Sequence, residues 1–385
     1  MKLVDCREYA FRVPPHEHIC ETEEGASAVS GVPFGTSQEK ARKSFPSSKV
    51  SRFVWERFMT LRENCGKKSI SSLQRFGKCK NFDLALLGYL SLTQCVSFRD
   101  YLILQMDRCS SRRIPESYVT HWRRHRIREL VNCEECELYL HNKLLTKRIL
   151  AQFGIPQTRA LVYIDKGNSF DVESMQPLGG IEAAAKLLLN TPFIVKGVTG
   201  SRGEQNFIYP SSDYDFDSCI EAILCALRSF NSSIMVEELV RGDLTPFRLA
   251  DSLNTVRVTT WRNAAGKIKV IGAAQRLAVR EGCGDNWADG GLAAEIDIDS
   301  GTVNGDFYSN ILRPHPDFSL KQSFEVPQWD SVKSLACQAH SIFHGMSSIG
   351  WDIANVSPQP LIIEGNHDWG LYIHQRTSGK GFDLN

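Results

Sequence analysis

The spacing of apolar and polar residues divides the chain into regions of different character. Residues 1–50 show no apolar period, which predicts an irregular arm or a long loop. Residues 51–142 carry apolar residues at helical spacing, so we expect several packed helices there. In the remaining residues short strand-like runs separate helical stretches, which predicts a mixed α and β core. We expect this core to divide into subdomains over 143–240 and 241–385.

The elements of the core follow from the apolar period and from the breaks at glycine and proline. Helical period predicts helices over 143–153, 181–189, 217–230 and 331–346. Apolar runs and alternation predict strands over 160–164, 192–196, 206–209, 233–240, 254–261, 268–280, 293–298, 351–356 and 360–366. A turn at 357–359 joins the last two strands into a hairpin.

That hairpin, IGWDIANVSPQPLIIEGN, gathers oxygen-bearing side chains. Successive strand side chains point to opposite faces, so Glu364 and Asn366 share a face, and strand pairing can place Asp352 beside them. Hard cations such as Mg²⁺ bind carboxylate and amide oxygens together with nucleotide phosphates. The pattern therefore favours a magnesium–nucleotide site. The alternative is an edge hairpin whose polar residues face water.

A glycine-rich loop follows the strand over 192–196. Its glycines Gly197, Gly200 and Gly203 allow backbone N–H groups to approach an anion closely, and Lys196 adds a positive charge just before the loop. The loop is not the GxxxxGK[ST] phosphate loop, because no helix follows and the lysine precedes the glycines. An anion-binding loop and a flexible turn are both compatible with this pattern.

Two of the predicted strands carry an arginine in mid-strand. In NTVRVTTW, alternation places Val256 and Val258 on one face and Arg257 on the other. Arg276 has a similar position in the strand over 268–280. A partly buried guanidinium can clamp an anion or can pair with a carboxylate on a neighbouring strand, and the sequence leaves both readings open.

Composition and charge exclude several classes of function. The chain has 385 residues, of which 42% are hydrophobic and 23% charged, as in a globular protein with a full core. The net charge of +1 gives no overall field for a polyanion, so we expect no nucleic-acid partner. The basic run WRRHRIR at 122–128 is more typical of a solvated helix face than of a phosphate-binding one.

Cysteine usage and hydropathy bear on the compartment. The twelve cysteines lack a dense, regular spacing, which favours reduced thiols. Cys133 and Cys136 form a CxxC, but no second pair stands at metal-ligand spacing, so we expect neither a zinc site nor a redox site there. The N-terminus lacks a signal-peptide core, and no stretch approaches the roughly 18 apolar residues of a membrane span. These features predict a cytoplasmic protein without a membrane span.

The order of the motifs resembles that of the ATP-grasp superfamily. A helix lysine, a strand lysine before a glycine-rich loop, an acidic strand end, strand arginines, and an Asp followed by Glu-x-Asn occur in that order. NTVRV, DNWADGGLAAEID, HPD at 315–317, GWDIA and LIIEGN look like the sugar-transfer-associated ATP-grasp family, which is related to α-L-glutamate ligases. The resemblance covers about 143–374. It implies an α+β fold, namely an ATP-grasp core of two α+β subdomains with the nucleotide cleft between them, preceded by a mainly helical N-terminal region.

The resemblance also implies roles for the residues that match its motifs. Those matched to ATP binding are Lys143, Lys196, Gly200, Ser201, Gly203, Glu237, Glu238, Leu239, Val240 and Asp243. The lysines and the loop would hold phosphates, the strand end would receive adenine partly through backbone groups, and the aspartate would meet a ribose hydroxyl. Those matched to Mg²⁺ or Mn²⁺ binding are Asp352, Glu364 and Asn366. Arg257 and Arg276 match the catalytic arginines that face the phosphates or the substrate carboxylate.

The activity implied by the resemblance is that of an ADP-forming carboxylate–amine or carboxylate–thiol ligase. Such an enzyme activates a small carboxylate as an acyl phosphate, in amino-acid, peptide or sugar-conjugate biosynthesis. Two alternatives remain: a nucleotide-binding module without turnover that works through a partner, and a phosphotransferase on the same scaffold. The full metal triad favours catalysis, whereas Glu204 and Gln205 stand where a more glycine-rich stretch is usual. The acid, the acceptor and the oligomeric state stay open.

Overall fold

The structure is a computed structural model with an α+β architecture built around two six-stranded sheets. It describes residues 57, 60, 84–104, 106, 118–121, 132–199, 206–211, 213–230, 232–281, 284–310, 321–379 and 381–382. The expected fold class is confirmed. The predicted arm over 1–50, the loop positions Gly200, Ser201 and Gly203, and the HPD motif lie outside the described residues.

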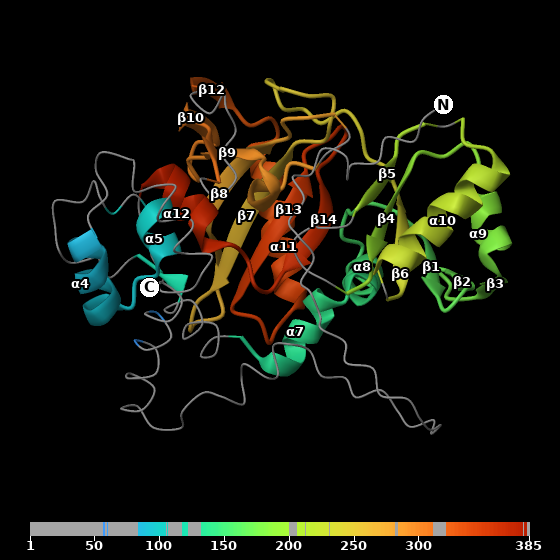
Figure 1. Cartoon of the computed structure of the whole chain (residues 1–385), viewed down its shortest axis with the longest axis horizontal. Coiled ribbons are helices and arrows are strands. Elements are labelled where there is room, and N and C mark those ends of the chain that lie inside the picture. The colour runs from blue at the N-terminus through green and yellow to red at the C-terminus, as the bar shows by residue number, and fades with distance from the viewer. Residues whose placement is uncertain are drawn as a thin grey trace, which may run out of the picture.

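The first sheet is antiparallel, in the order β3-β2-β1-β6-β4-β5. Its strands are β1 (Ala160–Asp165), β2 (Asn168–Asp171), β3 (Pro177–Gly179), β4 (Phe193–Gly197), β5 (Phe207–Tyr209) and β6 (Ile234–Glu238). Helices α9 (Ile181–Leu188) and α10 (Phe216–Phe230) cover one face (Figure 1). Alternation in β1 explains the packing, because Val162 and Ile164 point into this helix-covered core.

Two consecutive helices connect the first sheet with the rest of the molecule. They are α7 (Glu134–His141) and α8 (Lys143–Gln152), separated at Asn142, whose side chain accepts a hydrogen bond from Leu145 N at 3.1 Å. That bond caps the start of α8. Lys143 N donates to Val198 O at 2.9 Å, so the first turn of α8 is fixed beside the end of β4.

The second sheet is also antiparallel, in the order β11-β9-β8-β7-β13-β14. Its strands are β7 (Thr255–Arg262), β8 (Ile268–Leu277), β9 (Leu292–Glu295), β11 (Tyr308–Ser309), β13 (Ser348–Ala354) and β14 (Leu361–Asn366). A separate pair, β10 (Thr302–Asp306) and β12 (Lys321–Glu325), lies beyond its edge. A short 3-10 helix (Trp287–Asp289) precedes β9.

Helices cover both faces of the second sheet (Figure 1). Helix α11 (Trp329–Ile342) packs its apolar side on Val256 and Val258 of β7. On the opposite face α4 (Leu84–Gln94), α5 (Phe98–Ile103) and α12 (Leu371–Ser378) share a core with β8 and β9. Strand β7 therefore alternates as predicted, with its valines towards α11 and Arg257 on the other face.

The strand and helix boundaries differ from the predicted ones where burial hides the pattern. Strand β13 begins at Ser348, earlier than predicted, and all its residues are buried because β7 and β14 flank it. A strand covered on both faces shows no alternation, so its ends leave little trace in the sequence. Strand β8 ends at Leu277, short of residue 280, and α11 spans 329–342 in place of 331–346.

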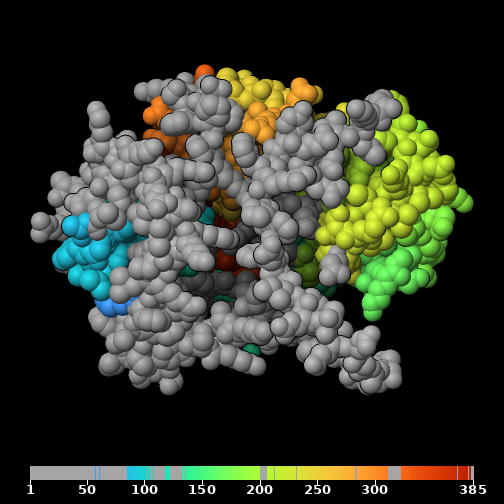
Figure 2. Space-filling model, in the orientation of Figure 1, coloured from blue at the N-terminus to red at the C-terminus, as the bar shows by residue number. Residues whose placement is uncertain are grey.

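The two sheets meet where β14 lies against the segment that leads into β1. Thr158 N donates to Ile362 O at 3.0 Å, and Ile362 N donates to Pro156 O at 2.9 Å. Figure 2 shows the first sheet and its helices as a body on one side of the molecule, with α4 on the opposite side. The contact at β14 consequently brings side chains of both sheets together.

Helices α4, α5 and α7 lie within the predicted helical region over 51–142. The cysteines in the described residues, Cys95, Cys133, Cys136, Cys219, Cys225 and Cys337, are all free thiols. In the part of the chain that the structure describes, no helix is both long and apolar enough to cross a membrane.

Candidate functional site

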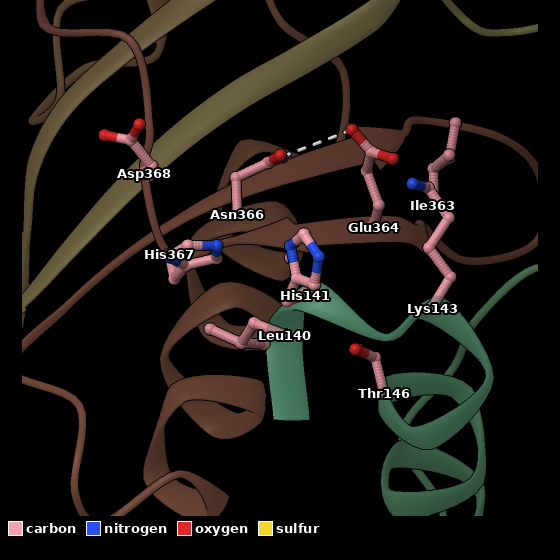
Figure 3. A pocket seen from close by; sticks show the side chains of 10 residues that line it. Leu140, His141, Lys143, Thr146, Ile363, Glu364, Asn366, His367 and Asp368 are labelled. Atoms are coloured by element: carbon pink, nitrogen blue, oxygen red, sulfur yellow. Dashed lines mark hydrogen bonds between the residues drawn. The ribbon is translucent and has the colours of Figure 1, made fainter. Parts of the chain in front are cut away.

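The hairpin of β13 and β14 brings together the three predicted metal-binding residues. Asp352 lies directly opposite Glu364, and Gly350 lies opposite Asn366. Asn366 Nδ2 is 3.3 Å from Glu364 Oε1 (Figure 3). It is also 3.5 Å from Asp352 Oδ2. We call Asp352, Glu364 and Asn366 the carboxylate–amide set. Its members share one face of the hairpin, as the strand period predicted.

The donors of this set suit a hard cation. Asp352 and Glu364 offer carboxylate oxygens, and rotation of the Asn366 amide would turn its oxygen to the same place. Within the described residues, no group of three or more His, Cys, Asp or Glu side chains is placed to hold a metal ion. A cation here would therefore depend on two carboxylates, one amide and oxygens from a bound ligand. Metal binding by the set stays a prediction.

Two arginines hold Asp352 from the neighbouring strands. Arg257 on β7 forms a two-point ion pair, with Nε 2.5 Å from Oδ1 and Nη2 2.9 Å from Oδ2. Arg276 Nη2 on β8 is 3.2 Å from Asp352 Oδ1. Burial opposes ionisation of Asp352, but the two guanidiniums outweigh it and lower its pKa to about 2. The sequence left open an anion clamp or a cross-strand ion pair for these arginines. The structure shows the ion pair.

Asp285 completes this arrangement, and sequence reasoning missed it. Its Oδ1 lies 3.2 Å from Arg276 Nη2, and its Oδ2 accepts hydrogen bonds from Thr255 N and Oγ1 at 2.6 Å each. Burial raises the pKa of Asp285 and outweighs the opposing effect of Arg276. The available signal was its place in the polar loop DNWADGG. We call Arg257, Arg276, Asp285 and Asp352 the arginine cluster.

A second buried group of charges surrounds Glu237 at the end of β6. Glu237 Oε2 is 3.1 Å from Lys196 Nζ on β4 and 3.3 Å from Lys147 Nζ on α8. It also accepts a hydrogen bond from Thr158 Oγ1 at 2.7 Å. Lys147 Nζ additionally donates to Thr158 O at 2.9 Å and to Thr158 Oγ1. We call Lys147, Lys196 and Glu237 the lysine cluster.

The electrostatics of the lysine cluster are those of buried, mutually paired ions. Burial opposes ionisation of Glu237, yet Lys147 and Lys196 outweigh it and lower its pKa to about 2. Burial also lowers the pKa of Lys147 to about 8, although the Glu237 carboxylate opposes this effect. Sequence analysis chose Lys143 on this helix and missed Lys147. The available signal was that Lys147 follows Lys143 by one helical turn and therefore lies on the same face of the helix.

The predicted adenine site at the end of β6 splits into buried and exposed side chains. The Glu237 side chain is buried and its Oε2 is engaged by both lysines, while its backbone lies in the sheet between β1 and β4. Glu238 is exposed and lies 3.3 Å from the exposed Arg159. Leu239 N donates to Pro192 O at 3.0 Å, and Val240 follows outside the strand. An adenine contact through this backbone stays a prediction.

Asp243, the predicted ribose ligand, serves its own loop in this structure. Its Oδ1 accepts from Thr245 N at 2.9 Å, and its Oδ2 accepts from Asn254 N at 3.0 Å and from Asn254 Nδ2 at 3.3 Å. The residue is buried. These contacts fix the approach to β7, and the ribose contact stays a prediction that they do not favour.

A pocket lies between β14 and the junction of α7 with α8 (Figure 3). Its lining residues are Leu140, His141, Lys143, Thr146, Ile363, Glu364, Gly365, Asn366, His367 and Asp368. Figure 3 shows the rings of His141 and His367 beneath Glu364 and Asn366, with Lys143 extending alongside Glu364. The pocket therefore joins one predicted phosphate lysine to two members of the carboxylate–amide set.

The CxxC motif lies at the opposite end of α7 from this pocket. Cys133 precedes the helix and is exposed, and its Sγ donates to Glu135 Oε2 at 2.9 Å. Cys136 lies in the first turn. Among the described residues, neither cysteine belongs to a group of three or more His, Cys, Asp or Glu side chains placed to hold a metal ion.

A comparison with solved structures finds proteins that are similar to this chain. Similar solved structures include D-alanine–D-alanine ligase from Bacillus anthracis (13% identity, TM-score 0.37, 64% of this chain and 64% of that chain). Others are N5-carboxyaminoimidazole synthase from Aspergillus clavatus (12%, 0.37, 63% and 50%) and biotin carboxylase from Campylobacter jejuni (13%, 0.39, 63% and 43%). The chain spans less than two thirds of the length of each. No curated protein matches the chain.

A family comparison covers more of the chain. The family described as sugar-transfer associated ATP-grasp matches residues 122–383, which is more than half of the sequence. The match includes both six-stranded sheets, the lysine cluster, the arginine cluster and the carboxylate–amide set. The resemblance seen in the motifs is therefore confirmed, and the chain belongs to the sugar-transfer associated ATP-grasp family.

Proposed function

We propose that this protein is an ATP-dependent, ADP-forming ligase that joins a carboxylate to an amine, or to a thiol, through an acyl phosphate. The observation that carries the proposal is the juxtaposition of two unlike charge groups at β14. On one side lies the lysine cluster, and on the other lies the arginine cluster with Glu364. Thr158 connects them, because it bonds to Glu237 through its hydroxyl and to Ile362 through its backbone.

The lysines and the glycine loop would bind the nucleotide. Lys196 is the penultimate residue of β4, and Lys143 lies beside the end of the same strand, so both lysines would face the phosphates of one ATP. Adenine would then lie against the backbone that follows β6. The positive charge of both ammonium groups would compensate the triphosphate, which is the main requirement of phosphoryl transfer.

The carboxylate–amide set would hold Mg²⁺, or Mn²⁺ in its place. Bound there, the cation would neutralise charge on the phosphate oxygens. Asp352 is ionised at neutral pH, because the two guanidiniums hold its pKa at about 2 in spite of burial. Glu364 accepts a hydrogen bond from Asn366 and lies at the mouth of the pocket.

The arginines would stabilise the reacting groups. A carboxylate oxygen of the substrate attacks the γ-phosphorus of ATP, and the bond from that phosphorus to the bridging oxygen breaks to release ADP. The amine nitrogen then attacks the acyl carbon, phosphate leaves, and the nitrogen loses a proton. Arg257 and Arg276 are held by Asp352 on the face of the sheet where the negative charge of the acyl phosphate would develop.

The test is substrate-dependent release of ADP. Purified protein with ATP and Mg²⁺ is incubated with pooled small carboxylates, including amino acids and sugar acids, alone and with pooled amines. We expect ADP and phosphate to appear only when both pools are present. ATP binding without any ADP release would favour a binding module, and transfer of phosphate to a stable product would favour a phosphotransferase.

A further inference from the structure

We infer that Lys147 is a positioning residue for the nucleotide phosphates. It engages Glu237 so that Lys196 keeps both free donor capacity and an uncompensated positive charge for an anion. This inference rests on the proposed nucleotide site and adds to it a residue that touches no nucleotide atom.

The donor count distinguishes the two lysines. An ammonium group has three N–H donors. Those of Lys147 meet three acceptors, namely Thr158 O, Thr158 Oγ1 and Glu237 Oε2. Lys196 has one acceptor in the described part of the chain, Glu237 Oε2 at 3.1 Å. Lys147 is therefore saturated by the protein, whereas Lys196 keeps two donors for a further acceptor.

The charge count leads to the same distinction. Two ammonium groups and one carboxylate leave the lysine cluster with one excess positive charge. The side chains are 5%, 6% and 1% exposed for Lys147, Lys196 and Glu237, so water compensates little of this charge. Burying an uncompensated charge is unfavourable. A buried lysine that creates such an excess of positive charge is expected where an anionic ligand balances the charge of the cluster.

A purely structural role would not require the charge of Lys147. Without it, Lys196 and Glu237 would form a balanced pair, and Thr158 would still donate to Glu237. Methionine has nearly the length of the lysine stem and carries no charge, so it would fill the same space without the cost of burying an ion. The charge of Lys147 is therefore better explained by a bound anion than by packing alone.

The position of the cluster identifies the anion as a phosphate of the bound nucleotide. Lys196 directly precedes the glycine-rich loop, and Lys147 lies one turn after Lys143. Charged groups facing Lys147 from the packed elements are Glu237 on β6, Lys196 on β4 and Glu364 on β14. The excess charge therefore lies between the predicted phosphate loop and the predicted metal site.

The first experiment measures MgATP binding by calorimetry at pH 7 for the wild type, Lys147→Met and Arg148→Met. Coulomb attraction over such distances inside a protein predicts on the order of a tenfold loss of affinity for Lys147→Met. The melting temperature without ATP should stay within a few degrees. Arg148→Met is the matched control, because it removes a cation from the same helix. The Arg148 side chain donates to Val172 O, which lies outside the lysine cluster. It should bind MgATP like the wild type.

The second experiment measures the same affinity from pH 7 to pH 9. Because burial lowers the pKa of Lys147 to about 8, the wild type should bind MgATP more weakly as the ammonium loses its proton. Lys147→Arg keeps its charge throughout this range and should lack that decline. Lys147→Met should start from the lower affinity and also lack it. A residue with a structural role alone would not move the pH profile.

The outcomes separate this inference from the proposed function. Absence of MgATP binding to the wild type would overturn both. Binding by the wild type together with unchanged affinity in Lys147→Met would overturn only the role of Lys147. If Lys147→Met fails to fold, Lys147→Gln takes its place in the calorimetry, and unchanged MgATP affinity in that variant overturns the role of Lys147.

Discussion

The lysine cluster and the arginine cluster are both buried and both built from ion pairs, but they differ in charge balance. In the lysine cluster one carboxylate, Glu237, serves two ammonium groups. In the arginine cluster two carboxylates, Asp285 and Asp352, serve two guanidiniums. Once Glu364 is added, the second sheet carries an excess of negative charge at β14. One side thus favours an anion and the other a cation.

Under the proposed function, this difference is the reason that residues of both sheets form one site. Phosphates and a divalent cation attract each other, and each is stabilised by protein charge of the opposite sign. If the excess positive charge and the excess negative charge lay in a single cluster, they would neutralise each other. Glu364 lies between the two clusters. Burial has the largest effect on the pKa of Lys147 and of Arg276, and the charge of Glu364 has a smaller effect that raises both pKa values.

The largest effect is expected from removing the negative excess. Glu364→Gln keeps the size of the side chain but loses its charge, so ADP release should fall by at least about a hundredfold. Without metal, stability should change little, because glutamine keeps an oxygen that accepts the hydrogen bond from Asn366. ADP release and melting in chelator measure the two quantities. Glu325→Gln on the exposed strand β12 is the control.

Unchanged turnover in Glu364→Gln would remove the carboxylate–amide set from the reaction. A collapsed fold would instead make Glu364 a structural residue. The dependence of ATP affinity on Mg²⁺ offers a readout besides activity, and it should weaken in the same variant.

The second effect is on acid stability and concerns the shared carboxylate of the lysine cluster. Burial opposes ionisation of Glu237, but the two lysines hold its pKa at about 2, below its ordinary value of 4.5. A lowered pKa stabilises the fold above pH 4.5, and this stability is lost as pH falls towards 2. The expected contribution is about 3 kcal/mol.

Glu237→Gln measures this contribution directly. Denaturant unfolding at pH 5 and at pH 2.5 should show a smaller loss of stability in the variant than in the wild type. The variant should also be less stable at pH 5, because Lys147 and Lys196 lose their shared partner. Equal losses in both proteins would mean that the pairing of Glu237 does not contribute to acid stability.

A third effect concerns the anion side. Lys196→Met should lower MgATP affinity by about thirtyfold, near 2 kcal/mol, because its free donors and charge would face the phosphates. Stability without ATP should change less, since Glu237 keeps Lys147 and Thr158 as partners. Calorimetry and melting give both numbers. Equal affinity in the variant and the wild type would show that the positive excess is not used for ATP.

The smallest effect is expected next to the cluster, at the neighbouring glutamate. Among the described residues Glu238 pairs with Arg159 at the surface, where the two side chains are 42% and 69% exposed. Glu238→Gln should change stability and MgATP affinity by less than about 0.5 kcal/mol. It is the matched control for Glu237→Gln. A large loss of affinity would mean that the Glu238 side chain, and not only its backbone, contacts the nucleotide.

The sequence by itself determined the local elements and the carboxylate–amide set. Strand side chains alternate with a period of two, so Glu364 and Asn366 share a face of β14. The connection spans 355–360 in place of the predicted turn at 357–359, and the pairing across it still sets Asp352 opposite Glu364. The same local rules placed Lys196 at the end of β4 and Arg257 opposite the valines of β7. These features depend on residues close together in the chain.

Only the tertiary structure decided which charged residues pair. Lys147 meets Glu237, and Arg276 meets Asp352, through contacts between elements far apart in sequence. Helical period could not choose between Lys143 and Lys147, because residues four apart lie on the same face of a helix. The choice came from the packing of α8 against β14, which buries the Lys147 ammonium beside Glu237 and leaves Lys143 at the pocket. Burial and register are properties of the assembled sheets, and no local pattern encodes them.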